Sequence, residues 1–142
     1  ARASPAMSEF LFPVKVYIED TDAGGIVYYV NYLKFMERAR SEWLNARGFG
    51  QRGLIEQGVQ LVVHSLSCRY ARPARLDDRL EVTANVSRLS SCSVRFEQAV
   101  RYDGDTLCEA TVDIACVDTQ RLKPMRWPGE LRAVLTSDIP SQ

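Results

Sequence analysis

Three carboxylates lie within four residues of this sequence, ahead of two glycines and an apolar, aromatic run. They are Glu19, Asp20 and Asp22, and the run that follows Gly24 and Gly25 leads into a predicted helix. A helix N-terminus presents unpaired N–H groups and the positive end of a dipole, so it can receive a developing oxyanion. A carboxylate just upstream could reach the same volume as nucleophile or general base. An acidic turn held by Asx-type hydrogen bonds explains the same residues, and both interpretations stay open.

Few other residues could take part in catalysis or bind a metal. His64 is the only histidine, which excludes multi-histidine zinc sites, and its apolar neighbours favour a structural role in a strand. The four cysteines, Cys68, Cys92, Cys108 and Cys116, contain no C-x-x-C pair. Each falls in a segment with a strand pattern, so we interpret them as small apolar filler and predict no metal site.

Two further motifs have simple explanations. Residues 48–53 match G-x-G-x-x-G, but they follow a helix, whereas a dinucleotide-binding loop follows a strand. We interpret them as a helix stop and a loop. Arg69, Arg72 and Arg75 are followed closely by two aspartates, which favours a self-compensating surface, although guanidinium groups also suit phosphates.

Length and charge narrow the classes of function. The chain has 142 residues, 46% of them hydrophobic, and 18 basic residues balance 18 acidic ones. This is the size of one domain with a proper core, and the balanced charge argues against a nucleic-acid partner. No apolar stretch approaches the roughly 20 residues of a transmembrane helix. The N-terminal residues lack the apolar core of a secretory signal, so we expect a cytoplasmic protein.

The elements that must position the acidic cluster follow from periodicity. Val14, Val16 and Ile18 alternate with polar residues, which predicts a strand that runs into the cluster. After it, a helix is predicted with Asn31 as N-cap and Gly48 as its stop. One face of this helix carries a large apolar stripe, formed by Tyr32, Phe35, Met36, Ala39 and Trp43.

The C-terminal half has the pattern of an antiparallel meander. A short helix near 51–57 precedes an extended run over 59–69, and alternating residues then predict strands over 80–86, 94–100 and 110–116. Asp103 and Gly104 lie between two alternating runs and predict a hairpin turn. A short closing helix is expected over 128–135. The predicted fold class is α+β, a sheet curled over one long helix.

Residues 16–32 and 35–40 resemble the signature of hotdog-fold acyl-CoA thioesterases of the 4-hydroxybenzoyl-CoA thioesterase type. The similarity is greatest to the branch encoded beside the Tol–Pal envelope genes, and it extends over 70–78 and into the last strand. The resemblance implies a five-stranded antiparallel sheet around a long central helix. It also implies a homodimer or homotetramer, with active sites at the dimer interface and the coenzyme A arm lying across both protomers. We therefore expect an extension over 1–12, a hotdog domain over 13–137 and a tail over 138–142.

The resemblance also assigns roles. It implies hydrolysis of an acyl-CoA thioester, with Asp22 attacking the carbonyl or activating a water and the backbone N–H of Tyr29 receiving the oxyanion. No metal or cofactor is implied, because coenzyme A is part of the substrate. Acyl-CoA and acyl carrier protein both remain open as carriers. Residues expected to contact substrate are Tyr17, Gly25, Val27, Tyr28, Tyr32, Phe35, Arg72 and Arg75.

One departure from the family pattern concerns Tyr29, because relatives carry histidine there. Tyrosine ordinarily titrates near pH 10, so it cannot replace a histidine base, whereas the backbone N–H is unaffected. Two rival functions remain. An acyl-thioester hydratase would need a histidine in the motif, and a non-catalytic binding or scaffold subunit would explain its loss. Glu37, a further carboxylate on the helix, is expected to face solvent or pair with Arg40.

Overall fold

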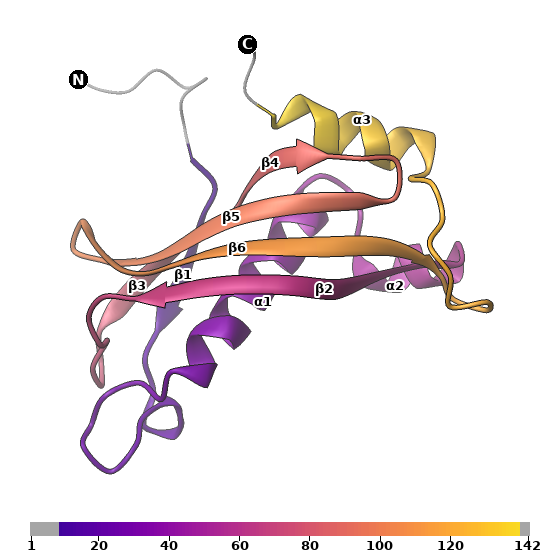
Figure 1. Cartoon of the computed structure of the whole chain (residues 1–142). Coiled ribbons are helices and arrows are strands. Elements are labelled where there is room, and N and C mark those ends of the chain that lie inside the picture. The colour runs from indigo at the N-terminus through magenta and orange to yellow at the C-terminus, as the bar shows by residue number, and fades with distance from the viewer. Residues whose placement is uncertain (1–8, 140–142) are drawn as a thin grey trace, which may run out of the picture.

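An antiparallel sheet wraps around one long helix, as Figure 1 shows. The computed structural model describes residues 9–139. Its strands are β1 (Leu11–Lys15), β2 (Val59–Tyr70), β3 (Arg79–Thr83), β4 (Asn85–Leu89), β5 (Ser93–Tyr102) and β6 (Asp105–Asp118). Its helices are the 3-10 turn η2 (Ile18–Asp20), α1 (Val30–Ala46), α2 (Gln51–Glu56) and α3 (Gly129–Ser137).

The sheet has six strands, not the five predicted. Their order is β1-β3-β5-β6-β2, and β4 lies off this path beside β5. The extra strand arises at Ala84, where the alternating run over 79–89 divides. Val82 on β3 pairs with Val100, whereas Val86 on β4 pairs with Phe96. Because the alternation continues on both sides of Ala84, the pattern resembles a single strand.

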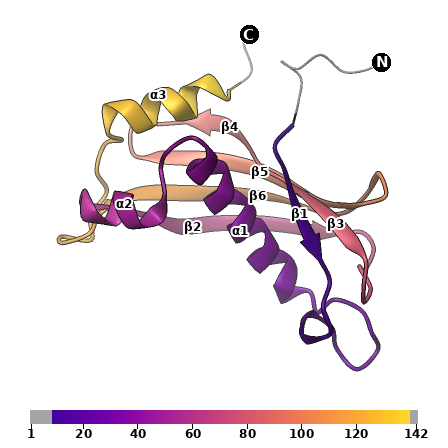
Figure 2. The same ribbon diagram turned by 180° about the vertical axis from the view of Figure 1, so that it is seen from behind.

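Helix α1 crosses the inner face of the sheet, which Figure 2 shows from the helix side. The predicted stripe is confirmed, since all five of its residues are buried. The predicted start is wrong by two positions, since the N-cap was expected at Asn31. The helix begins at Val30 with Tyr29 as N-cap residue, and Asn31 lies inside the first turn. Gly48 follows the helix with a φ of +90°, a conformation that favours glycine.

The helix is held to the sheet by packing and by a buried amide. Trp43 contacts Phe96 edge to face, with ring centroids 5.4 Å apart. Gln98 on β5 is buried, and its Nε2 donates to the carbonyl oxygens of Met36 (3.0 Å) and Thr83 (3.1 Å). Its Oε1 accepts a hydrogen bond from Arg40 Nη1 at 2.9 Å. This buried amide links the middle of α1 to β5, and its hydrogen bonds offset the cost of removing it from water.

Several local predictions are confirmed. Asp103 and Gly104, with φ of 50° and 86°, form the turn between β5 and β6, and α2 and α3 occupy their predicted places. The prediction that Ile18 belongs to the first strand is wrong. This residue lies in η2 with 76% of its surface exposed, because the strand ends three residues earlier. The first eight residues of the predicted extension 1–12, and residues 140–142 of the predicted tail 138–142, lie outside the described residues.

The cysteines largely fill space as predicted. Cys68, Cys108 and Cys116 lie in strands, but Cys92 lies in the turn between β4 and β5. Burial raises the pKa of the Cys108 thiol above its ordinary range and that of Cys116 to about 11, so both are protonated at neutral pH. Within residues 9–139, no helix is long and apolar enough to cross a membrane.

Candidate active site

The acidic segment folds into a tight turn that presents Asp22. The backbone N–H of Asp22 donates to the carbonyl oxygen of Ile26 at 2.9 Å, and Thr21 forms a β-bridge with Val27. The carboxylate oxygen Oδ1 of Asp22 accepts the N–H of Gly24 at 2.8 Å. The turn is therefore an Asx turn, as one of the two interpretations of the sequence predicts. Among residues 9–139, no hydrogen bond engages the other oxygen, Oδ2.

The chain enters α1 with two adjacent backbone donors unused, at Tyr29 and Val30, and of these two residues only Tyr29 lines the cleft described below. The N–H of Tyr28 donates to the carbonyl oxygen of Asp20 at 3.1 Å, and the N–H of Asn31 donates to that of Tyr28 at 2.8 Å. Between them, the N–H groups of Tyr29 and Val30 have no hydrogen-bond acceptor among the residues that the structure describes. A free N–H at the N-terminal end of a 17-residue helix is a suitable donor to an oxyanion.

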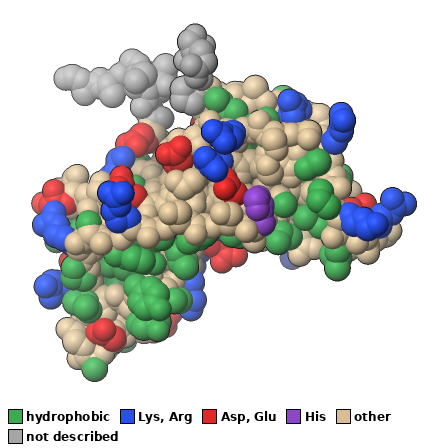
Figure 3. Space-filling model, viewed as in Figure 1, with side chains coloured by type: hydrophobic (Ala, Val, Ile, Leu, Met, Phe, Trp, Pro, Cys, Tyr) green, Lys and Arg blue, Asp and Glu red, His purple; other side chains and the backbone are tan. Residues whose placement is uncertain are grey.

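Asp22 and Tyr29 line one cleft of about 470 Å³. Its walls come from the acidic turn, the first turn of α1 and the segment that follows β2. Figure 3 shows hydrophobic side chains gathered between the end of β2 and the loop before α1. The lining residues are Asp22, Ile26, Val27, Tyr28, Tyr29, Tyr32, Tyr70, Ala71, Arg72 and Pro73. Asp22 is the only carboxylate among them.

Four tyrosine rings form an aromatic wall in this cleft. Tyr29 lies 5.0 Å from Tyr28 and 5.8 Å from Tyr70, and Tyr70 lies 5.6 Å from Tyr32, measured between ring centroids. Burial raises the pKa of the Tyr32 and Tyr70 hydroxyls, and the nearby Cys68 thiol adds to the effect at Tyr70. Both phenols are neutral at pH 7, so neither acts as a base.

Tyr70, Ile26, Ala71 and Pro73 are cleft residues that sequence reasoning missed. Tyr70 ends β2, and the pairing of this strand with β6 carries it to the first turn of α1. The residues around Tyr70 belong to the segment with family resemblance, and that similarity was the available signal.

Four predicted contact residues lie outside the cleft lining. Tyr17 is 59% exposed and lies under the ammonium group of Lys15, 5.6 Å from its ring centroid. Phe35 is buried behind Tyr32, with ring centroids 6.3 Å apart. Gly25 has a φ of +79° and shapes the acidic turn. Arg75 donates its backbone N–H to Asp78 and lines no wall.

Three other polar candidates from the sequence lie at the rim of the cleft or outside it. Arg72 lies at the rim of the cleft, where its Nη2 pairs with Asp105 at 2.7 Å. His64 lies at an irregularity in β2, exposed and outside the cleft. Glu37 is exposed on α1, as expected. Within residues 9–139, no cluster of three histidine, cysteine or acidic side chains is arranged to hold a metal ion.

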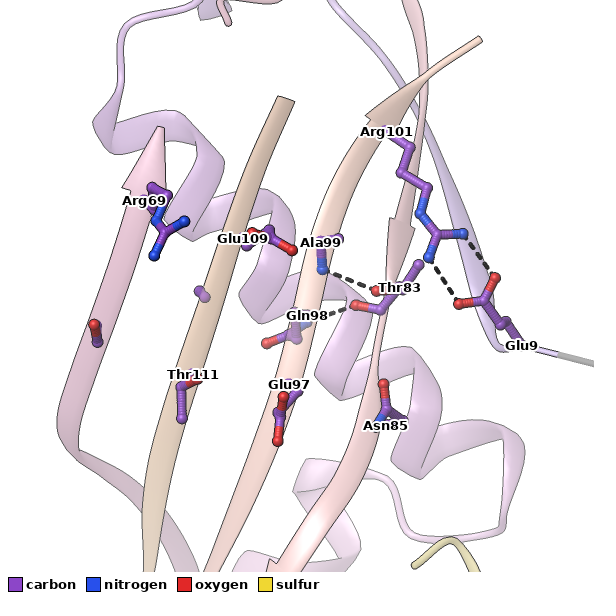
Figure 4. A pocket seen from close by; sticks show the side chains of 12 residues that line it. Glu9, Arg69, Thr83, Asn85, Glu97, Gln98, Ala99, Arg101, Glu109 and Thr111 are labelled. Atoms are coloured by element: carbon purple, nitrogen blue, oxygen red, sulfur yellow. Dashed lines mark hydrogen bonds and ion pairs between the residues drawn. The ribbon is translucent and has the colours of Figure 1, made fainter. Parts of the chain in front are cut away.

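A second hollow, of about 350 Å³, lies on the outer face of the sheet (Figure 4). Two of its charges are paired with each other, since Arg101 donates two hydrogen bonds of 2.7 and 2.9 Å to Glu9. Its wall is further fixed by the N–H of Ala99, which donates to the Thr83 hydroxyl at 2.8 Å. The hollow contains no helix N-terminus, so the inner cleft is the better candidate for an active site.

Comparison with known proteins shows the family of this chain. A sequence model of the thioesterase-like superfamily matches residues 16–135. The chain belongs to this superfamily. It is 46% identical to the acyl-CoA thioesterase YbgC of Haemophilus influenzae over 87% of this chain and 92% of that protein. It is 42% identical to the acyl-CoA thioester hydrolase YbgC of Escherichia coli O157:H7 over 87% of this chain and 93% of that protein.

A solved structure extends the comparison to three dimensions. The crystal structure of a probable thioesterase from Bartonella henselae has a TM-score of 0.80 and 34% identity, covering 85% of this chain and all of that one. The predicted hotdog fold is thus confirmed for this member of the superfamily, with six strands in place of five. The predicted class of enzyme, a thioester hydrolase, is confirmed as well.

Proposed function

We propose that this thioesterase hydrolyses acyl-CoA thioesters in the cleft between the acidic turn and α1. The observation that carries the proposal is that Asp22 and the free N–H of Tyr29 line the same cleft. The two relatives named above, whose names describe action on acyl-CoA, support the choice of substrate. The proposed location is the cytoplasm, as expected from the sequence.

The reaction has two routes to the same products. Asp22 either attacks the thioester carbonyl carbon and forms a mixed anhydride, which water then cleaves, or it takes a proton from a water that attacks directly. In both routes the carbonyl oxygen becomes an oxyanion that accepts the N–H of Tyr29. The C–S bond breaks as this oxyanion collapses. Over the whole reaction the water gives one proton to the thiolate of coenzyme A and the other to solvent, and the acyl group leaves as a carboxylate. No metal or cofactor takes part in the proposed reaction.

The side chain of Tyr29 has a packing role in this proposal. Its ring contacts Tyr28 and Tyr70, and these apolar faces form the wall against which the acyl group lies. The oxyanion donor belongs to the backbone, so the tyrosine in place of the family histidine leaves it in position. Arg72 at the rim is the candidate contact for an anionic part of coenzyme A.

A second copy of the chain is part of the proposal. β2 forms one edge of the sheet and carries apolar side chains that α1 does not cover. Val63 is 44% exposed, Leu66 40% and Tyr70 41%. We propose that β2 pairs with its counterpart in a homodimer, which would cover this stripe and bring a partner next to the cleft. Light scattering on purified protein distinguishes a monomer, which would contradict this step, from a dimer or tetramer.

Turnover of a panel of thioesters tests the proposed reaction. Hydrolysis of short, long and aromatic acyl-CoAs is followed by the loss of thioester absorbance, because the chain's own cysteines would consume thiol reagents. One acyl chain is also presented on acyl carrier protein, which distinguishes the two carriers. Asp103→Asn, in the turn between β5 and β6, is the matched control for Asp22→Asn.

The outcomes separate the rival functions. Hydrolysis of at least one acyl-CoA that Asp22→Asn abolishes and Asp103→Asn preserves supports the proposal. If the unaltered chain binds acyl-CoA without turnover above Asp22→Asn, the protein is a binding subunit and the catalytic proposal is wrong.

A further inference from the structure

We propose that Asn31 is a positioning residue for the reaction, because its side-chain amide holds the acidic turn in register with the Tyr29 N–H. The inference rests on the proposed function and adds to it a residue that touches neither substrate nor reacting atoms. Asn31 is partly buried, and it is absent from the lining of the cleft. The sequence suggested a helix cap at this position, and the structure shows a different contact.

The contact is made through one carbonyl group. The Nδ2 group of Asn31 donates to the carbonyl oxygen of Asp20 at 2.9 Å, across eleven residues of sequence. The same oxygen accepts the N–H of Tyr28 at 3.1 Å. A carbonyl oxygen has two lone pairs, so these two donors occupy both. The Tyr28 N–H and the Asn31 side chain thus both donate to the Asp20 carbonyl, and they lie on either side of Tyr29 in the sequence.

These two hydrogen bonds help to set the distance between the Asp22 carboxylate and the Tyr29 N–H. Asp22 lies two residues beyond Asp20, and its own N–H is bonded to Ile26 in the returning arm of the turn. Tyr29 lies between the two residues that hold Asp20. Within residues 9–139, Asn31 is the only side chain of α1 that makes a hydrogen bond to the turn over 17–28. This amide is therefore the direct side-chain link between α1 and the turn that carries Asp22, beside the backbone hydrogen bonds and the indirect link through Ala74.

Loss of the amide should affect the rate more than binding. The turn would keep its backbone hydrogen bonds and its indirect link to α1 through Ala74, but no side chain of α1 would bond to it directly. A displacement of about 1 Å between catalytic groups can cost a hundredfold in rate. The aromatic wall that contacts the acyl group is built from other residues, so substrate affinity should change little.

The experiment compares Asn31→Ala and Asn31→Ser with Asn45→Ala, an exposed asparagine at the far end of the same helix. Serine retains a polar side chain too short to reach Asp20, and it provides a second variant if the alanine variant folds poorly. We expect kcat for acyl-CoA hydrolysis to fall about 10- to 100-fold in both Asn31 variants, with KM within about threefold. Asn45→Ala should retain the kcat and KM of the unaltered chain.

A double variant distinguishes positioning from general support of the fold. If Asn31 acts through Asp22, then Asn31→Ala added to Asp22→Asn should lower the residual rate less than about twofold. A further loss as large as in the unaltered background would overturn the inference, as would Asn31 variants with undiminished kcat. A chain that lacks acyl-CoA hydrolysis altogether would overturn the proposed function itself. Unfolding curves establish that each variant is folded at the assay temperature.

Discussion

The hydroxyl oxygen of Tyr32 accepts a hydrogen bond from the backbone N–H of Ala74 at 2.8 Å, in the buried wall of the cleft. This bond joins the first turn of α1 to the segment between β2 and β3. The carbonyl oxygen of Ala74 in turn accepts the N–H of Val27 at 2.8 Å. The buried Ala74, next to the cleft residue Pro73, thus binds both the helix and the acidic turn, and Tyr32 shapes the cleft through its hydroxyl as well as through its ring.

Substitution of Tyr32 by phenylalanine should destabilise the protein. The change leaves the buried N–H of Ala74 without its acceptor, so we expect the free energy of unfolding to fall by about 1–3 kcal/mol. Urea unfolding measures this loss, and Tyr102→Phe, in an exposed position of β5, serves as the control. Equal stabilities of Tyr32→Phe and the unaltered chain would contradict the structural role of this hydrogen bond.

The backbone donor at Tyr29 can be removed selectively. The φ of Tyr29 is −57°, which proline can adopt, so Tyr29→Pro removes the N–H with little change in φ. Compared with Tyr29→Ala, which loses the ring but keeps the N–H, the proline variant should have a kcat lower by about 10²–10³-fold. Steady-state kinetics on folded protein measures the difference. Similar kcat values in the two variants would mean that the oxyanion finds its donor elsewhere.

Substitutions of Arg72 and of Asp105 should change the KM for acyl-CoA in opposite directions. If Arg72 contacts an anionic part of coenzyme A, Arg72→Gln should raise KM about 3- to 10-fold, as expected for one exposed charge contact. Asp105→Asn frees the arginine from its 2.7 Å ion pair and should lower KM. Both effects should diminish at high salt. An unchanged KM in Arg72→Gln would place the coenzyme contact elsewhere.

The ion pair between Arg95 and Asp113 on the outer face of the sheet predicts a pH dependence. The guanidinium of Arg95 donates hydrogen bonds of 2.8 and 3.1 Å to Asp113 and holds the pKa of that carboxyl below its ordinary value of 3.8. A depressed pKa contributes stability above pH 3.8, and this contribution is lost as the pH falls through the folded-state value. Asp113→Asn should therefore lower the melting temperature at pH 7 slightly, by about 2 °C or less.

Thermal melts of both proteins between pH 7 and pH 2.5 test this prediction. The difference in melting temperature should shrink as the pH falls below 3.8. A difference that is equally large at pH 2.5 would show that Asp113 stabilises the fold by some means other than its charge.

The parts of the fold that the sequence could predict are those set by neighbours along the chain. The buried stripe of α1 follows from helical spacing, and the turn at Asp103 and Gly104 follows from the backbone preferences of those two residues. Ala84 shows the limit. The chain divides there because β3 and β4 lie along different parts of β5, and an alternating pattern contains no information about that pairing.

The candidate site was predictable in part for the same reason. Asp22 and Tyr29 lie in one short segment, so a local motif could bring them together. Tyr70 reaches the cleft only through the pairing of β2 with β6, a contact between distant segments. Asn31 was misjudged because its amide bonds to a carbonyl eleven residues earlier, where the bend of the turn decides the partner.

The most direct test of the central claim is the rate of acyl-CoA cleavage in a single turnover, with enzyme in excess, for the unaltered chain and for Asp22→Asn. This rate isolates the chemical step from product release. We predict that Asp22→Asn binds acyl-CoA with an affinity within about threefold but cleaves it about 10²–10⁴-fold more slowly. Cleavage by Asp22→Asn within about threefold of the unaltered rate would contradict the account.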